Sequence, residues 1–210
     1  TWQLRPESTP NYWDLVVSTG ISSVSSSQAI AANDLSGSNT VALTGGTITA
    51  SAPSGTITNP LAINSPSLIE TQSGARLTIS GEISGASKLS ISNSAGAGGV
   101  VVLVADNPNF SGGLSVSSGA NVEVNSALAL GTGSVELVGS ATTPATLTTT
   151  ADMTITNPIS VSGDPVFNVA AGTTTTISSP ITDGASSGDV VVSGGGTLNL
   201  TAVNTYTGPT

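Results

Sequence analysis

Residues 194–208 read Gly-Gly-Gly-Thr-Leu-Asn-Leu-Thr-Ala-Val-Asn-Thr-Tyr-Thr-Gly, and variations on this stretch make up most of the chain. The three glycines permit a tight turn or a bulge. Segment 197–201 alternates polar and apolar residues, so its two leucines share one face, as in a half-buried strand. Asn204 and Gly208 bracket a second turn. The stretch therefore predicts a turn, a short strand and another turn.

Short alternating segments of the same kind recur from Thr40 onward, between residues rich in Gly, Pro, Asn and Ser. No window carries the i, i+3, i+4 spacing of an amphipathic helix over a useful length. We therefore expect an all-β protein with strands at 41–43, 47–49, 56–58, 61–63, 77–79, 89–91, 100–104, 114–116, 122–124, 135–137, 159–161, 166–169, 190–192 and 198–200, and around Leu147, Ile155 and Ile177.

Two parts of the chain resemble each other at a separation of 98 residues. Residues 56–63 read Thr-Ile-Thr-Asn-Pro-Leu-Ala-Ile, and residues 154–161 read Thr-Ile-Thr-Asn-Pro-Ile-Ser-Val. The similarity extends over a long repeat, about 56–113 and 154–210. Inside it is a finer spacing of roughly 20–28 residues, which is the size of one turn of a β-solenoid.

These observations favour a parallel β-helix over residues 36–210. Each turn would stack on the next at about 4.8 Å, with Val, Ile and Leu inside and Ser, Thr and Asn outside. Asn-Pro pairs at 59–60, 107–108 and 157–158 fit corners, because Pro lacks an N–H and Asn tolerates left-handed backbone. A globular β-sandwich is the competing fold, since it also shows short strands. The 98-residue similarity and the scarcity of aromatic residues favour the solenoid.

Residues 1–35 differ from the rest, because Trp2, Tyr12 and Trp13 are half of all the aromatic residues. A solenoid needs a cap, since its terminal turn exposes both core and strand edges. We interpret this segment as an N-terminal cap or irregular entry segment. A binding surface built on exposed Trp is the alternative.

The charge balance excludes several classes of partner. The net charge is −9, and the only basic residues are Arg5, Arg76 and Lys88. A nucleic-acid backbone needs a basic stripe, so we expect no nucleic-acid partner. The longest apolar run, 100–105, is too short to cross a bilayer. The absence of Cys means that the β core has to hold the fold without disulfides.

The repeat resembles a known family pattern in residues 155–161, then Gly172, Ile177 and Ile181, and above all the Gly-Thr-Leu-x-Leu and Asn-Thr-Tyr-Thr-Gly motifs at 196–208. These residues resemble the autotransporter-associated β-strand repeat, which marks passenger domains of type V secreted bacterial proteins. The resemblance is clear over about 154–210, looser over 56–113 and weak before residue 40. Pro209 stands where Gly is usual, and the first copy has one extra residue.

The resemblance implies a right-handed parallel β-helix that is exported through its own outer-membrane β-barrel, which this chain does not contain. We therefore expect a fragment of a longer protein, at the bacterial cell surface or secreted via the outer membrane. Its function would be that of a stalk or adhesin scaffold that aids its own translocation, with a host-cell surface, matrix or glycan receptor as partner. One alternative is a self-associating module whose rods pair side by side. Another is a carbohydrate-active enzyme.

No residue is expected to be catalytic, to hold a cofactor or to bind a metal. Glu123 and Glu136 lie mid-strand, and two facing carboxylates on adjacent strands can act as acid and base. The favoured interpretation is a pair of solvated outer charges that limit aggregation. Without His or Cys, no conventional catalytic triad can form.

Two oxygen-rich corners are the candidates for a calcium ion: Asp183-Gly184 with Asp189, and Asp106 with Asn107 and Asn109. We interpret both as ordinary turns capped by side chains, without bound metal.

Threonine runs at 148–150 and 173–176 raise the possibility of a flat array that binds ice or sugar. Their positions vary between turns, so we ascribe them to β-propensity. The aromatic residues Phe110, Phe167 and Tyr206 are expected to be buried rather than to stack on sugar rings.

Overall fold

The structure is a computed structural model that describes residues 3–6, 13–16, 23–25, 29–31, 35, 37–51, 54–93, 98–117 and 119–210. Of residues 3–6, 13–16, 29–31 and Ser54 it describes the backbone alone. Trp2, Tyr12 and the side chain of Trp13 lie outside this description, so the interpretation of residues 1–35 as a cap stays a prediction.

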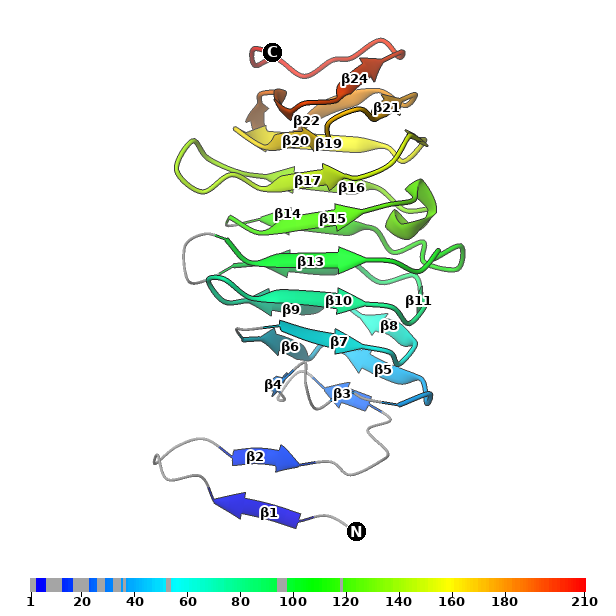
Figure 1. The fold of residues 1–210 in the computed structure, drawn as a ribbon, viewed down its shortest axis with the longest axis vertical. Coiled ribbons are helices and arrows are strands. Elements are labelled where there is room, and N and C mark those ends of the chain that lie inside the picture. Colours follow the sequence, from blue (N-terminus) through cyan, green and yellow to red (C-terminus); the bar gives the residue numbers. More distant parts are fainter. Residues whose placement is uncertain are drawn as a thin grey trace.

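The described chain winds into a parallel β-solenoid of about seven turns, which confirms the predicted fold (Figure 1). One side is a seven-stranded sheet whose strands, in order along the chain, are β7 (Ser54–Ile57), β10 (Arg76–Ile79), β13 (Val100–Leu103), β15 (Asn121–Val124), β17 (Thr146–Thr149), β20 (Val166–Val169) and β23 (Val191–Gly194).

The second side is an eight-stranded sheet of β4 (Ala29–Ala31), β6 (Thr47–Ala50), β9 (Ser67–Thr71), β12 (Leu89–Ser92), β14 (Leu114–Ser117), β16 (Val135–Val138), β19 (Ile159–Gly163) and β22 (Ile181–Gly188). In Figure 1 the seven-stranded sheet runs rightward in front as the chain climbs and the chain returns behind it, so the coil is right-handed. This is the hand that strand twist favours for parallel crossovers.

The third side is divided. Its lower part is a sheet of β3 (Ser23–Ser25), β5 (Val41–Thr44), β8 (Leu61–Ser65) and β11 (Ile83–Ser84), and its upper part is a sheet of β18 (Met153–Ile155), β21 (Thr174–Ile177) and β24 (Thr197–Leu200). Between them a single bridge joins Gly85 to Phe110, and the 3₁₀ helix η2 (Ala127–Leu130) replaces a strand. Separately, β1 (Gln3–Pro6) and β2 (Trp13–Val16) form an antiparallel hairpin.

The length of one turn follows from the strand register. Leu61 pairs with Val41, 20 residues earlier, and Leu114 pairs with Leu89, 25 residues earlier. Both values fall within the expected range. Inward residues stack on one another to form a continuous core: in the seven-stranded sheet, Leu77, Val101, Val122, Leu147 and Phe167 follow each other, and none is more than 2% exposed.

The two similar parts of the sequence occupy different sides of the coil. Ile57 lies in the seven-stranded sheet, whereas Ile155, 98 residues later, lies on the third side. Likewise Leu61 lies on the third side and Ile159 in the eight-stranded sheet. The separation therefore corresponds to four turns plus one side. The repeated unit is a strand with its corner, and it fits any side because every side needs a short alternating strand.

One hydrogen bond is reproduced by this rotation. The side chain of Asn107 accepts the Ile83 N–H at 2.7 Å, and the side chain of Asn204 accepts the Ile181 N–H at 2.9 Å. Ile83 belongs to the third side and Ile181 to the eight-stranded sheet. Each asparagine lies about one turn after the isoleucine that it binds, so the motif connects successive turns.

The predicted Asn-Pro corners are confirmed, and their side chains do more than shape the backbone. Asn107 also donates to the Ala129 carbonyl at 2.6 Å, and Asn157 donates to the carbonyls of Gly131 and Gly133 at 3.0 and 2.7 Å. Both amides are buried. They supply hydrogen bonds to main-chain groups at corners, where the strand ladder is interrupted.

Replacing Asn107 with alanine is expected to destabilise the coil by about 2–4 kcal/mol. The substitution leaves the Ile83 N–H and the Ala129 carbonyl buried without this partner, and each such loss costs about 1–3 kcal/mol. The control is Asn109→Ala, since Asn109 is exposed and bonds only to the Glu82 side chain among the contacts described. Urea unfolding followed by circular dichroism measures both. Equal midpoints for the two variants would contradict the assigned role of Asn107.

Candidate functional site

The hypothesis that Glu123 and Glu136 face each other is wrong. Glu123 lies on β15 in the seven-stranded sheet, and Glu136 lies on β16 in the eight-stranded sheet. The two strands are consecutive in the chain, but consecutive strands of a solenoid lie on different sides. A sequence shows which residues point outward, whereas the side of the coil depends on how each corner turns.

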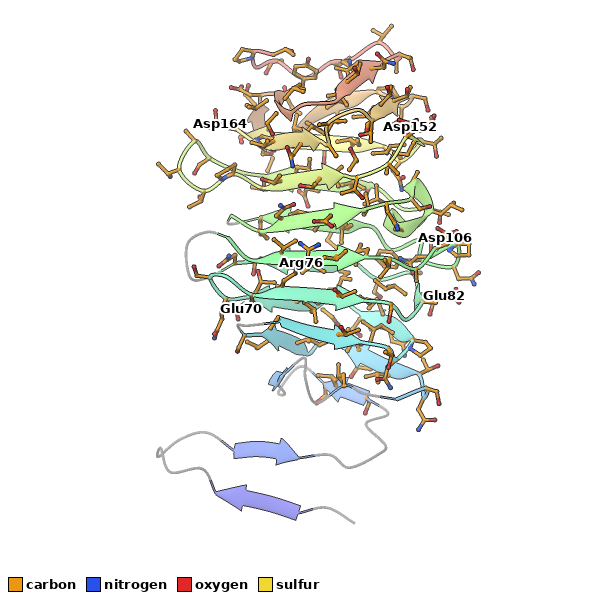
Figure 2. The ribbon with its side chains drawn as sticks, viewed as in Figure 1. Glu70, Arg76, Glu82, Asp106, Asp152 and Asp164 are labelled. Carbon is orange, nitrogen blue, oxygen red and sulfur yellow. The ribbon has the colours of Figure 1, made fainter. Side chains whose placement is uncertain are left out.

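Each glutamate instead pairs with a basic residue two turns below it. Arg76 on β10 holds Glu123 with two hydrogen bonds, at 2.7 and 3.1 Å, across the intervening strand β13. Lys88, just before β12, binds Glu136 at 3.0 Å across β14. Figure 2 shows Arg76 on the outer surface of the front sheet.

These ion pairs oppose the use of either glutamate as a general acid. The hydrogen bond from Lys88 lowers the pKa of Glu136, and the Ser115 side chain lowers it further. A general acid at neutral pH needs a raised carboxyl pKa instead. The pairs therefore act as outer braces, each of which spans three turns. Because the charges are largely exposed, each pair contributes about 0–1 kcal/mol.

A line of polar side chains also connects four turns on the outside of the seven-stranded sheet. Thr148 donates to Asn121 at 2.9 Å, Asn168 donates to Thr148 at 3.3 Å, and Ser193 donates to Asn168 at 3.1 Å. These outward side chains satisfy one another across strands. Part of this surface is therefore bonded internally rather than held open for a ligand.

The threonine runs do not make one flat array. Thr149 and Thr175 point inward, are buried, and share a hydrogen bond of 2.6 Å. Thr148 and Thr174 point outward on different sides of the coil. The alternation of each strand divides every run between the core and the surface.

The two oxygen-rich corners are occupied by hydrogen bonds of the protein itself. Asp183 accepts the N–H groups of Gly188 and Thr207 at 2.9 and 3.1 Å and the Thr207 hydroxyl at 2.8 Å. These bonds lower the pKa of Asp183, that from Gly188 most. Asp106 accepts the Ser126 hydroxyl at 2.7 Å. Within the described residues no three His, Cys, Asp or Glu side chains gather in a way that suits a metal ion.

The described carboxylates that do approach each other are Asp164 and Asp189. Partial removal from water raises the pKa of Asp189, and the neighbouring Asp164 raises it further. Sequence reasoning missed this pair, although a signal existed. The two residues are 25 apart, the same separation as between the paired residues Val166 and Val191. Figure 2 shows that the other labelled acids, Glu70, Glu82, Asp106 and Asp152, are spread over different turns.

The aromatic side chains of the coil belong mainly to its interior. Phe110 and Phe167 are each 2% exposed, as expected, and Tyr206 is partly buried against the core. None of these three offers a free ring face large enough to act as a sugar-stacking platform.

The last turn is the most open part of the described chain. A shallow groove of about 540 Å³ is lined by Asp189, residues 190–192, Pro209 and Thr210. Beside it, Val191, Val192 and Val203 are exposed.

None of the family models, curated proteins or solved structures compared with this chain matches it. Within the part of the chain that the structure describes, there is also no helix with the length and apolar character needed to span a membrane.

Lys88→Met is expected to raise the pKa of Glu136 toward its ordinary value. Because Lys88 lowers this pKa in the folded state, the stabilisation is present above the carboxyl pKa of the unfolded chain and is lost as pH falls through the folded value. Titration of the Glu136 side-chain carbon by NMR measures the shift. Arg76→Met is the matched control, since its partner lies on another sheet. An unchanged Glu136 titration in Lys88→Met would show that the ion pair does not form in solution.

Asp183→Ala is expected to loosen the C-terminal segment, because three donors from Gly188 and Thr207 lose their acceptor. Hydrogen exchange followed by mass spectrometry should show faster exchange in residues 204–208. Asp106→Ala removes a single contact to Ser126, far from this segment, and serves as the control. If both variants exchange like the unmodified protein, Asp183 does not hold the segment in place.

Proposed function

We propose that this chain is the β-helical stalk or adhesin scaffold of an autotransporter passenger, displayed at a bacterial cell surface or secreted. The observation that supports it is one right-handed stack of about seven turns, together with the repeat motif at 154–210. A stack of this kind is stiff, since each turn bonds to its neighbours along all three sides. It suits a function in which loops are held at a distance from the cell.

The strand register also supports a contribution to export. Paired strands are only 20–25 residues apart, so each new turn can form as soon as that length has emerged. The turn already formed offers its strand edges as a template for the next. Stepwise folding on the outer side would oppose backward movement of the chain without a chemical energy source. This is the mechanism that we propose for its role in its own translocation.

Corner segments are the candidates for contact with a host-cell surface, matrix or glycan receptor. The loop between β16 and β17 projects from one edge of the stack (Figure 1). Its hydroxyl groups bond to each other, with Ser140 2.9 Å from Thr143 and 3.2 Å from Thr142. On another corner, Leu128 of η2 is exposed.

Side-by-side association of rods is a second candidate function. On the eight-stranded sheet, the outward residues Ser90, Ser115, Glu136 and Ser160 align in register on successive strands. Three small side chains in this row leave a flat strip, and the charge of Glu136 is balanced by Lys88. A flat polar strip is compatible with close lateral contact.

The export role predicts that loss of the last part of the coil reduces display. The chain is placed between a secretion signal and an outer-membrane translocator, with an N-terminal epitope, and surface epitope is measured by antibody on intact cells. Replacing residues 154–210 with a Gly/Ser-rich linker of equal length should lower display several-fold, because a flexible linker provides no template. Equal display of both proteins would contradict the export role.

A separate measurement distinguishes adhesive surface from scaffold. Labelled folded protein is titrated onto host cells and matrix glycans, with heat-unfolded protein as control. Saturable binding that is lost on unfolding would identify the coil as an adhesive surface. Absence of binding by folded protein would leave it the role of stalk and scaffold.

A further inference from the structure

The two ends of the solenoid differ in how their apolar residues are covered. At the N-terminal end, the lowest described inward residues, Val24 and Ile57, are 0% exposed. The large apolar side chains that are exposed among the described residues are Val104, Leu128, Val191, Val192 and Val203. Three of these five lie in the last turn. The C-terminal end is therefore the open end of the described core.

The inward column of the seven-stranded sheet shows what is missing there. Leu147 and Phe167 are 1% and 2% exposed, because the next residue of the column covers each of them. Val192 is the last member of this column, pairs with Phe167, and is 46% exposed. Val203, at the following corner, is 84% exposed.

The same end presents unpaired strand edges. In the described sheets, β23 and β24 are each a terminal strand. Val191 donates to the Pro165 carbonyl below it, so the main-chain groups of Val192 point to the open edge. By contrast, β22 is covered by the C-terminal segment through bonds from Val190 to Pro209 and from Gly208 to Gly188. The open edge is thus confined to β23 and β24.

This edge lacks the features by which proteins prevent strand pairing. Residues 190–203 contain no charged residue and no proline, the two commonest protections of an exposed strand edge. An uncharged edge that carries exposed valines has the chemistry of a pairing surface. Its natural complement is another β-strand edge with the same properties.

We propose that the C-terminal end is an interface for a second copy of this chain, with two rods meeting C-terminal end to C-terminal end about a twofold axis. Head-to-tail joining would need an exposed apolar complement at the N-terminal end, and the described residues there provide none. A twofold contact uses the same surface on both copies and closes after two. β23 then pairs antiparallel with β23 of the partner, and Val192 is covered by the partner's last turn.

Two measurements on the purified chain test this proposal. Light scattering across a concentration series should show mass rising from 20.3 kDa to about twice that value, with no larger species. Small-angle X-ray scattering should show a longer particle whose cross-section is unchanged. A mass of 20.3 kDa at every concentration, an open series of larger species, or a dimer with a wider cross-section would each overturn it.

Variants locate the contact. Val192→Lys places charge on the open edge, and Val203→Lys does so at a position too exposed to affect folding. Each is expected to weaken the dimer at least about tenfold, which corresponds to about 1.4 kcal/mol. Val104→Lys is the matched control, since Val104 is 40% exposed but lies after β13, far from the end. A dimer that resists both end variants, or that Val104→Lys weakens equally, contradicts the assigned interface.

Discussion

Each turn of this coil depends on the next turn for its hydrogen bonds and for the cover of its apolar residues. The column from Leu77 to Phe167 stays dry because every member is covered by the one above it, and the first uncovered member, Val192, is 46% exposed. Burial of a valine or leucine side chain contributes about 1.5–3 kcal/mol, so a lone turn would lack most of its stabilisation. Corners, ion pairs and polar lines all serve this stacking.

The inward and outward pattern could be predicted from the sequence because alternation in a strand fixes which residues are buried. It identified the solenoid, the turn length, the corners at Asn107 and Asn157 and the burial of Phe110 and Phe167. It did not show which side of the coil each strand occupies, because that depends on how sharply each corner turns. For this reason Glu123 and Glu136 were placed together wrongly, and the rotation of the repeat by one side was not foreseen.

The contacts that sequence reasoning missed all cross between turns. Asn107 was expected to shape a corner through its own backbone, whereas its side chain binds groups 24 and 22 residues away. Asp164 and Asp189 lie one turn apart and meet near the open end. Once the turn length is known, the same separation relates many neighbours. A search for polar pairs at 20–25 residues would have found several of these contacts.

The described surface is one in which polar groups largely bond to each other. The line from Asn121 to Ser193 and the two ion pairs stiffen the coil from outside, and Asp183 fastens the last segment to it. Stiffness and extension are the properties that a stalk requires, which is why we propose display rather than catalysis. The uncovered end is the exception, and it is where we place contact with another copy.

The central claim is the regular stack, and distances along one outward column test it most directly. Thr56, Glu123, Thr148 and Ser193 lie in one column of the seven-stranded sheet, three, four and six strands apart from Thr56. The chain has no cysteine, so spin labels can be attached to introduced pairs alone. Pulsed electron resonance should give separations from position 56 of about 14, 19 and 29 Å, since strands are about 4.8 Å apart. Separations that do not rise with strand number, as in a compact sandwich, would contradict the stacked coil.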